Sequence, residues 1–174
     1  MFKHEPVDLG YKDLATKYKG GRHYVIEKTD AKTVYYPSIT NLLGNLSKKA
    51  IQEWRDRIGH EEANKISRQA ASRGTAVHAM CELYVNNDPD YNKGVMPNIE
   101  YDFNRIKNIL DTRIGVVYGQ EIPLYSDHLK VAGRVDLVAE FDGKLSIIDY
   151  KTSKKTKKYE WCHSYFMQEC FYAI

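Results

Sequence analysis

The stretch KVAGRVDLVAEFDGKLSIIDYKT, residues 130–152, decides the fold. Two runs rich in valine, isoleucine and leucine flank Asp142-Gly143. An Asp-Gly pair between two apolar runs is a strong signal for a two-residue β-hairpin turn. A turn of that length pairs Phe141 with Lys144, and this pair fixes the register of the whole hairpin.

Counting back through this register places Asp136 directly opposite Asp149, and Arg134 opposite Lys151. Strand alternation then puts Asp136, Asp149 and Lys151 on one face, provided that no one-residue bulge shifts the pairing. Opposed carboxylates repel, and burial strengthens the repulsion. Three arrangements relieve it: the acids share a proton, Arg134 and Lys151 pair with them, or they hold a divalent cation.

A cation explains the most residues. Carboxylate oxygens are hard ligands that suit Mg²⁺ or Mn²⁺. Lys151, two residues beyond Asp149, is well placed to orient or deprotonate a water, or to stabilise charge that develops on a phosphate. Two acids, a metal and a lysine therefore predict a site that hydrolyses phosphodiesters.

The rest of the chain predicts an α/β fold in one domain, residues 1–174. Residues 1–37 indicate short strands around turns, and residues 38–114 indicate helices. Ser38 is the expected N-cap of the first helix. A long helix is expected over residues 61–85, interrupted at Gly74. Residues 115–174 contain three strand-like runs and then a helical pattern.

Composition limits the function classes. The 174 residues are 43% hydrophobic and 28% charged, which is typical of a globular domain, and no apolar run approaches the length of a membrane span. The N-terminus has neither signal-peptide nor transit-peptide character, so we expect a location in the cytoplasm of a bacterium or a phage-infected host. The net charge is +3, yet lysines cluster after residue 150, Lys154 and Lys155 among them.

Several motifs resemble one nuclease family. Gly133-Arg134-Val135-Asp136, then twelve residues, then Asp149-Tyr150-Lys151 resembles the core of the PD-(D/E)xK nuclease superfamily. The wider pattern is similar to the RecB-like exonuclease branch, and especially to the mitochondrial genome maintenance exonuclease group and its phage relatives. The segments that carry this likeness are YYPSITNLL (residues 35–43), RGTAVH (73–78) and QECFY (168–172).

The resemblance implies a central mixed sheet flanked by helices, with an N-terminal helical region. It implies Mg²⁺ or Mn²⁺ held by His78, Asp136, Asp149 and the backbone carbonyl of Tyr150, with Lys151 as the catalytic lysine. Glu121 is either a further metal ligand, a residue just behind the ligands, or an ordinary strand-end glutamate. The substrate-binding residues that we expect are Arg73, Thr75, Arg134, Lys154, Lys155, Gln168 and Tyr172.

The resemblance also implies an exonuclease that acts on free ends of single-stranded DNA in replication, recombination or repair. A replication or recombination protein is a compatible partner, and no membrane is expected. The alternatives are a duplex-specific or structure-specific endonuclease, and a nuclease-like domain that binds without cutting. Cys162 and Cys170 lack the spacing of the family's iron–sulfur cysteines, so we expect no cluster. The family fold continues beyond the last helix into a further strand and helix, so we expect either that this chain is a C-terminally truncated fragment or that something else completes the sheet.

Overall fold

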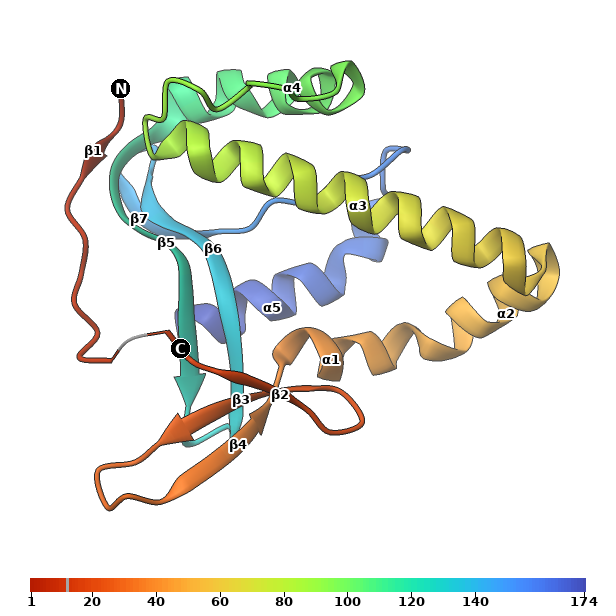
Figure 1. The fold of residues 1–174 in the computed structure, drawn as a ribbon, viewed down its shortest axis with the longest axis horizontal. Coiled ribbons are helices and arrows are strands. Elements are labelled where there is room, and N and C mark those ends of the chain that lie inside the picture. The colour runs from red at the N-terminus through yellow and green to blue at the C-terminus, as the bar shows by residue number, and fades with distance from the viewer. Residues whose placement is uncertain (12) are drawn as a thin grey trace.

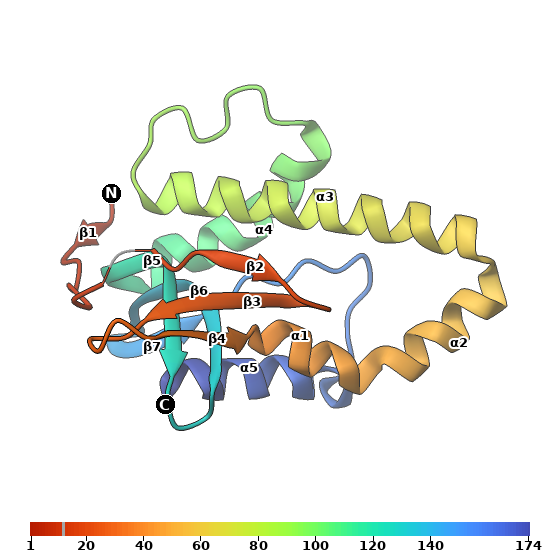
Figure 2. The ribbon, with the colours of Figure 1, turned by 60° about the horizontal axis from the view of Figure 1, so that its bottom comes forward.

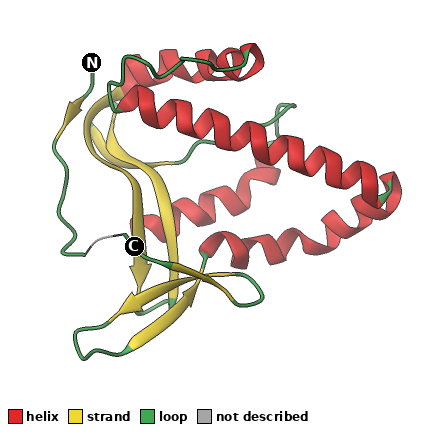
Figure 3. Ribbon diagram, viewed as in Figure 1, coloured by secondary structure: helices red, strands yellow, loops and turns green. Residues whose placement is uncertain are grey.

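The computed structural model describes residues 1–11 and 13–174 of the chain. It contains a four-stranded sheet in the order β1-β5-β6-β7 and a three-stranded sheet in the order β2-β3-β4 (Figure 1, Figure 3). The strands are β1 (Lys3–His4), β2 (Thr16–Tyr18), β3 (Arg22–Glu27), β4 (Thr33–Pro37), β5 (Ile114–Ser126), β6 (Val131–Phe141) and β7 (Lys144–Ile148). The helices are α1 (Ile39–Gly44), η1 (Asn45–Ser47), α2 (Lys48–Ile58), α3 (His60–Val85), α4 (Pro97–Arg113), η2 (Tyr159–Cys162) and α5 (His163–Ala173).

The larger sheet is mixed, as expected. β1 pairs in parallel with β5, whereas the β5–β6 and β6–β7 pairs are antiparallel. Figure 2 shows α3 and α4 on one side of the strands and α1 and α5 on the other, with the smaller sheet crossing β5 and β6. The expected α/β architecture with a mixed sheet flanked by helices is thus confirmed.

The predicted hairpin is confirmed in its turn and its register. Asp142 and Gly143 both have positive φ, 51° and 73°, as the favoured two-residue turn requires. The pairs run without a shift from Phe141–Lys144 to Leu137–Ile148. Irregular register occurs instead in the β5–β6 ladder, between Ile114 and Gly119.

The hairpin ends earlier than its apolar pattern suggested. β7 stops at Ile148, so Asp149 and Lys151 lie in the segment that follows the strand. Where the next backbone hydrogen bond between β6 and β7 would form, the Tyr150 backbone N–H donates instead to Asp136 Oδ2 at 2.7 Å. The predicted pairing of Arg134 with Lys151 is therefore wrong, since the ladder does not extend that far.

Three hydrophobic clusters hold the layers together. Val77, Met80 and Cys81 of α3 pack with Phe103 of α4 and with Leu137 of β6. On the other side, α1 and α5 pack on β6 through Ile39, Leu43, Val131, Val135, Phe171 and Tyr172. The smaller sheet packs on β6 through Tyr24, Ile26, Tyr36 and Ala132. β6 is the element common to all three clusters, so it connects the layers.

Two expectations for the helices need correction. α3 is continuous through Gly74, and the hydrogen of this glycine faces the segment after β7: a Cβ there would lie 3.5 Å from Thr152 Oγ1. Ser38 does occupy the N-cap position of α1, but its hydroxyl does not cap the helix. The hydroxyl lies 2.7 Å from Thr40 Oγ1 and accepts a hydrogen bond from Arg22 Nη2.

Within the part of the chain that the structure describes, no helix combines the length and the apolar character that crossing a bilayer would require.

The tightest contact between α5 and the sheet occurs at Gly133. A Cβ added there would lie 2.6 Å from Tyr172 Cε1 and 2.9 Å from Ile39 Cγ2. We expect Gly133→Ala to lower the free energy of unfolding by about 1–3 kcal/mol, as overpacking of a tight core does. Urea denaturation checks this.

Gly44→Ala is the matched control for Gly133→Ala. Nothing lies within 4 Å of the Cβ that this change adds, and the backbone of Gly44 is helical. We expect no loss of stability, and a gain of at most about 1 kcal/mol. Equal effects of the two changes would show that the contact with Tyr172 does not limit packing.

Candidate active site

A cleft of about 640 Å³ opens where α3, β5, β6 and α5 meet the end of β7. We call it the acidic pocket. The structure brings most of the predicted site residues to it. Its lining is Arg22, Thr40, Gly74, Thr75, His78, Ala79, Glu82, Glu121, Arg134, Asp136, Asp149, Lys151 and Gln168.

Asp136 is held from two sides at the floor of this pocket. Its Oδ2 accepts the Tyr150 backbone N–H and lies 3.4 Å from His78 Nδ1. The hydrogen bond to Asp136 raises the pKa of His78 above its ordinary value, although burial opposes this shift. The ring of His78 also meets the edge of the Tyr150 ring at a centroid distance of 5.7 Å. The helix-borne histidine is thus oriented toward the carboxylate.

Asp149 is the most deeply buried acid of the pocket, with 5% of its side chain exposed. Its Oδ1 accepts a hydrogen bond from Gln168 Nε2 at 2.8 Å, and its Oδ2 forms an ion pair with the Lys151 ammonium. Oδ2 nevertheless lacks a hydrogen bond of good geometry among the described residues. Burial, followed by the charge of Asp136, raises the pKa of Asp149, while Lys151 opposes the rise.

The two carboxylates are therefore each paired with a base. The Lys151 ammonium pairs with Asp149, and His78, when it is protonated, pairs with Asp136. This is one of the arrangements left open by the sequence, but with His78 in place of Arg134. The Arg134 side chain instead forms an ion pair with Asp13, donates to the Glu121 carbonyl at 2.6 Å and lies 3.9 Å from Glu121 Oε2.

Glu121 lies in the middle of β5 and not at a strand end. The pairs Gln120–Leu137 and Ile122–Val135 flank it, so it stands opposite Asp136. Its φ is +50°, a conformation that costs a non-glycine residue about 1 kcal/mol. Burial, and then the charge of Asp136, raises the pKa of Glu121. Its place beside Asp136 suits a ligand or a residue just behind the ligands.

The last helix, α5, contributes two buried side chains that support the acidic pocket. Gln168 and Tyr172 lie four residues apart on α5, and both are 6% exposed. The Tyr172 hydroxyl donates to the Arg134 carbonyl at 2.9 Å. Burial leaves the Tyr172 ring no surface for a substrate, so its role in the structure is to seat α5 on β6. Gln168 lines the pocket and holds Asp149.

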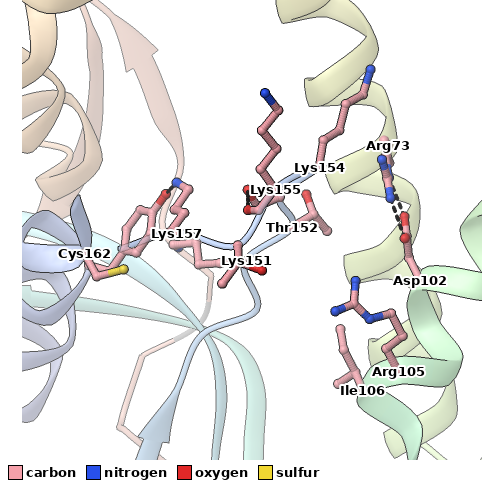
Figure 4. Close-up of a pocket in the computed structure, with 13 residues that line it drawn as sticks. Arg73, Asp102, Arg105, Ile106, Lys151, Thr152, Lys154, Lys155, Lys157 and Cys162 are labelled. Carbon is pink, nitrogen blue, oxygen red and sulfur yellow. Dashed lines mark hydrogen bonds and ion pairs between the residues drawn. The ribbon is translucent and has the colours of Figure 1, made fainter. Parts of the chain in front are cut away.

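A second cleft, of about 510 Å³, adjoins the acidic pocket (Figure 4). We call it the basic cleft. It lies between the segment after β7 and the helices α3 and α4, with Arg73 and Arg105 facing Lys154 and Lys155. Arg73 forms a two-pronged ion pair with Asp102. The other lining residues are Ile106, Lys151, Thr152, Ser153, Thr156, Lys157, Cys162 and Tyr165.

Lys151 lines both clefts. The carboxylates lie on one side of it and the cationic side chains of the basic cleft on the other. A polyanion in the basic cleft would consequently meet Lys151 where it reaches the acidic pocket. Such an arrangement can attract a phosphate chain and present one phosphate to the carboxylates.

The donor set fits a hard divalent cation, but it is not preassembled. No three His, Cys, Asp or Glu side chains within residues 1–11 and 13–174 are gathered closely enough to hold a metal ion. The pairs Lys151–Asp149 and His78–Asp136 explain this, because they use the same atoms that a metal would need. The buried Oδ2 of Asp149, without a well-formed hydrogen bond, is the observation that favours a cation.

Sequence reasoning missed four residues near these carboxylates. Arg22, Thr40 and Glu82 line the acidic pocket. Glu82 follows His78 by four positions on α3, a spacing that was available as a signal. Thr40 lies in the stretch YYPSITNLL that carries the family likeness, but neither this stretch nor the strand pattern around Arg22 indicates that the two side chains reach the carboxylates.

Glu169, beside Gln168, is the fourth missed residue. Both of its carboxylate oxygens are buried and lack a hydrogen-bond partner among the described residues. Burial and the nearby Asp149 raise the pKa of Glu169 to about 7, against the opposing charge of Lys151. The helical pattern of His163–Ala173 gives no sign that this acid points inward.

Comparison with known proteins finds similarity to the nuclease family that the sequence motifs resemble. Residues 96–174 match the PD-(D/E)XK nuclease superfamily. The chain is also 28% identical over 130 residues to mitochondrial genome maintenance exonuclease 1 of Mus musculus. That alignment covers 70% of this chain and 38% of the mouse protein.

We expect Glu169→Gln to change how stability depends on pH. A raised carboxyl pKa means that the folded state favours the neutral form, so Glu169 contributes most below its ordinary pKa. That contribution is lost as the pH rises through about 7. Relative to wild type, the variant should gain about 1 kcal/mol at pH 8, since water partly screens the site, and little at pH 5.

Urea denaturation in EDTA at both pH values measures this gain. Glu160→Gln, which alters an exposed glutamate of η2, is the matched control. A gain for Glu169→Gln that is the same at pH 5 and pH 8 would contradict the assignment of a neutral buried acid.

Proposed function

We propose that this chain, whose residues 96–174 form a PD-(D/E)XK nuclease superfamily core, is a divalent-metal-dependent exonuclease that hydrolyses single-stranded DNA from free ends. The observation that carries the proposal is the position of Lys151. It is shared by a pocket of carboxylates and a cleft of cations, as a phosphodiester hydrolase needs.

Members of this superfamily generally use divalent metal ions. In this chain the Asp136 and Asp149 carboxylates, the Tyr150 carbonyl and neutral His78 would hold the ion, with Mg²⁺ or Mn²⁺ favoured by the oxygen donors. A bound divalent ion supplies charge neutralisation at the phosphate and a more acidic water. Glu121 stands opposite Asp136 and is the further acid available to this site.

The chain's own residues perform the remaining tasks. Gln168 fixes Asp149 by donating to its Oδ1, and the Tyr150 N–H fixes Asp136. The Lys151 ammonium stands where a phosphate leaves the basic cleft, so it can donate to a phosphate oxygen or orient the attacking water. Thr75, on the rim of the acidic pocket, offers a hydroxyl to the same phosphate.

The choice of a single strand rests on the composition of the basic cleft, whose lining includes Arg105, Lys154, Lys155 and Lys157. Cationic grooves that follow the backbone are typical of sequence-independent binding to single strands. The curated mouse relative is named an exonuclease, and that name supports attack from free ends. A role in DNA replication, recombination or repair, with a protein partner from those processes, is consistent with this activity.

We expect Lys151→Ala to slow cleavage of a linear single strand by roughly 100-fold or more, as loss of an acid–base or charge-stabilising group does. Asp149→Asn should abolish cleavage, while its oxygen can still accept from Gln168. Both variants should retain binding to the labelled strand. Lys144→Ala, which alters an exposed lysine at the hairpin turn, is the control and should cleave like wild type.

The assay uses 5′-labelled and 3′-labelled linear strands, a circular single strand and a linear duplex, each with Mg²⁺, Mn²⁺ or EDTA. Degradation of the linear single strand with metal alone is the expected result, and the circle should remain intact. Cutting of the circle would favour an endonuclease, and degradation of the linear duplex would contradict the preference for single strands. Binding without any cutting would favour a domain that only binds nucleic acid, and undiminished cleavage by Lys151→Ala would remove the mechanism.

The basic cleft makes a separate prediction about salt. Replacing Lys154 and Lys155 together by glutamine should make the plot of log affinity against log salt concentration less steep by about 1.4, because each phosphate contact on a single strand contributes about 0.7. Fluorescence anisotropy in EDTA measures this slope.

The paired control is Lys48→Gln with Lys49→Gln, two exposed lysines of α2 that line neither cleft. The two double variants carry the same net charge, so general electrostatic attraction changes equally. An unchanged slope for the Lys154 and Lys155 variant would mean that the strand does not pass along the basic cleft.

A further inference from the structure

The hairpin of β2 and β3 borders the acidic pocket at a place other than the basic cleft. Arg22, the first residue of β3, lines the acidic pocket but not the basic cleft. In Figure 2 this hairpin belongs to the smaller sheet that crosses β5 and β6. A strand whose scissile phosphate lies at the carboxylates therefore has a second surface to contact, beyond the lysines already described.

Arg22 is fixed in position, and its charge is free. Its Nη2 donates to Ser38 Oγ and to Thr40 Oγ1, each at 3.1 Å. Its guanidinium carbon lies 5.6 Å from the centre of the Tyr24 ring. Within residues 1–11 and 13–174 no carboxylate forms an ion pair with it. A guanidinium has five N–H donors, so Nη1 and Nε remain for an anion.

Tyr18 stands directly across the hairpin from Arg22. Opposed residues of an antiparallel pair project to the same face, so the Tyr18 ring lies on the face that Arg22 presents to the pocket. This ring is 81% exposed, on an edge strand whose three residues are all exposed. A large aromatic side chain with so little packing contributes little to the core, and its flat face is available to a ligand.

The same hairpin is cationic. Lys17 and Lys19 flank Tyr18, and their ammonium groups lie 5.9 Å and 3.8 Å from the centre of the Tyr35 ring. Strand alternation puts Lys17 on the face opposite to Tyr18 and Arg22, so these lysines add positive charge to the hairpin without lining the subsite. Gly21 lets the turn approach α1 closely, because a Cβ there would lie 2.7 Å from Asn41 Nδ2. The hairpin tip is thereby held beside the pocket.

We propose that Arg22 and Tyr18 form a nucleotide subsite in which Arg22 binds a phosphate next to the scissile one and Tyr18 stacks on the adjoining base. The subsite takes single-stranded DNA, because the bases of a duplex are already stacked on their neighbours. It rests on the proposed function, since it places the strand relative to Asp136 and Asp149. The basic cleft and this hairpin then hold the strand on separate parts of the pocket rim.

The test measures binding of a fluorescent single-stranded oligonucleotide in EDTA, where no cleavage occurs. Tyr18→Ala should weaken binding roughly 5- to 150-fold, the usual cost of losing one base–aromatic stack, whereas Tyr18→Phe should bind like wild type. Tyr101→Ala is the matched control, because Tyr101 is 67% exposed on α4 and lines neither cleft. It should have no effect.

An abasic oligonucleotide of the same length separates stacking from charge. On this strand wild type and Tyr18→Ala should bind equally, while Arg22→Gln should still bind more weakly and with a salt slope about 0.7 less steep. Thermal melting confirms that each variant is folded. Equal affinity of wild type and Tyr18→Ala for the normal strand, or an equal loss on both strands, would overturn the subsite.

Failure of this subsite and failure of the proposed function give different results. Metal-dependent degradation of linear single strands by wild type is measured on the same preparation. If degradation occurs and Tyr18→Ala binds normally, only the subsite is wrong. If wild type neither degrades nor binds single strands, the proposed function is wrong, and the subsite is overturned with it.

Discussion

Two carboxylates held side by side against their mutual repulsion are the constraint on which the site depends. The hairpin turn at Asp142-Gly143 sets the register that brings Asp136 next to Asp149. Burial makes their closeness more costly. Three surrounding elements each contribute a group that offsets this repulsion: a histidine from α3, a lysine from the segment after β7, and an amide from α5. Without those partners one of the two acids would take up a proton, because like charges in a low-dielectric site cannot both stay ionised.

Lys151 belongs to both clefts, and its position makes sense only when the two clefts are considered together. Lys151 belongs to the acids by its ion pair and to the basic cleft by its location. It lines both the pocket that holds the carboxylates and the cleft that holds the lysines, so it can orient a polyanion as well as attract it. One short segment thus determines which side of the site is acidic and which is basic. This segment leaves the sheet at Ile148 and passes α3 at Gly74.

How far the sequence predicts this structure depends on the range of the interactions. The hairpin and its register follow from local turn chemistry, so the predicted pairs are correct from Phe141–Lys144 to Leu137–Ile148. The end of β7 is not predicted, because a side chain, Asp136, takes the hydrogen bond that a ladder partner would have made. The partners of Arg134 are likewise missed, since Asp13 comes from a distant segment with no pattern of its own. Glu169 is missed because burial of an acid depends on tertiary packing alone, and Arg22 because its neighbours come from α1.

Because α5 packs on the sheet and also holds a site residue, the sheet can be folded in molecules whose site is not formed. This helix touches the sheet through the Gly133–Tyr172 contact and touches the chemistry through Gln168 and Asp149. The hairpin, in contrast, is held by its own turn and by the cluster beneath α3 and α4. If α5 leaves the sheet, Asp149 loses its amide donor, while the hairpin turn and the cluster beneath α3 and α4 contain no α5 residue that would be lost with it. The fraction of molecules with an intact sheet can therefore differ from the fraction in which Gln168 holds Asp149. A spectroscopic signal that follows the sheet reports only the first fraction.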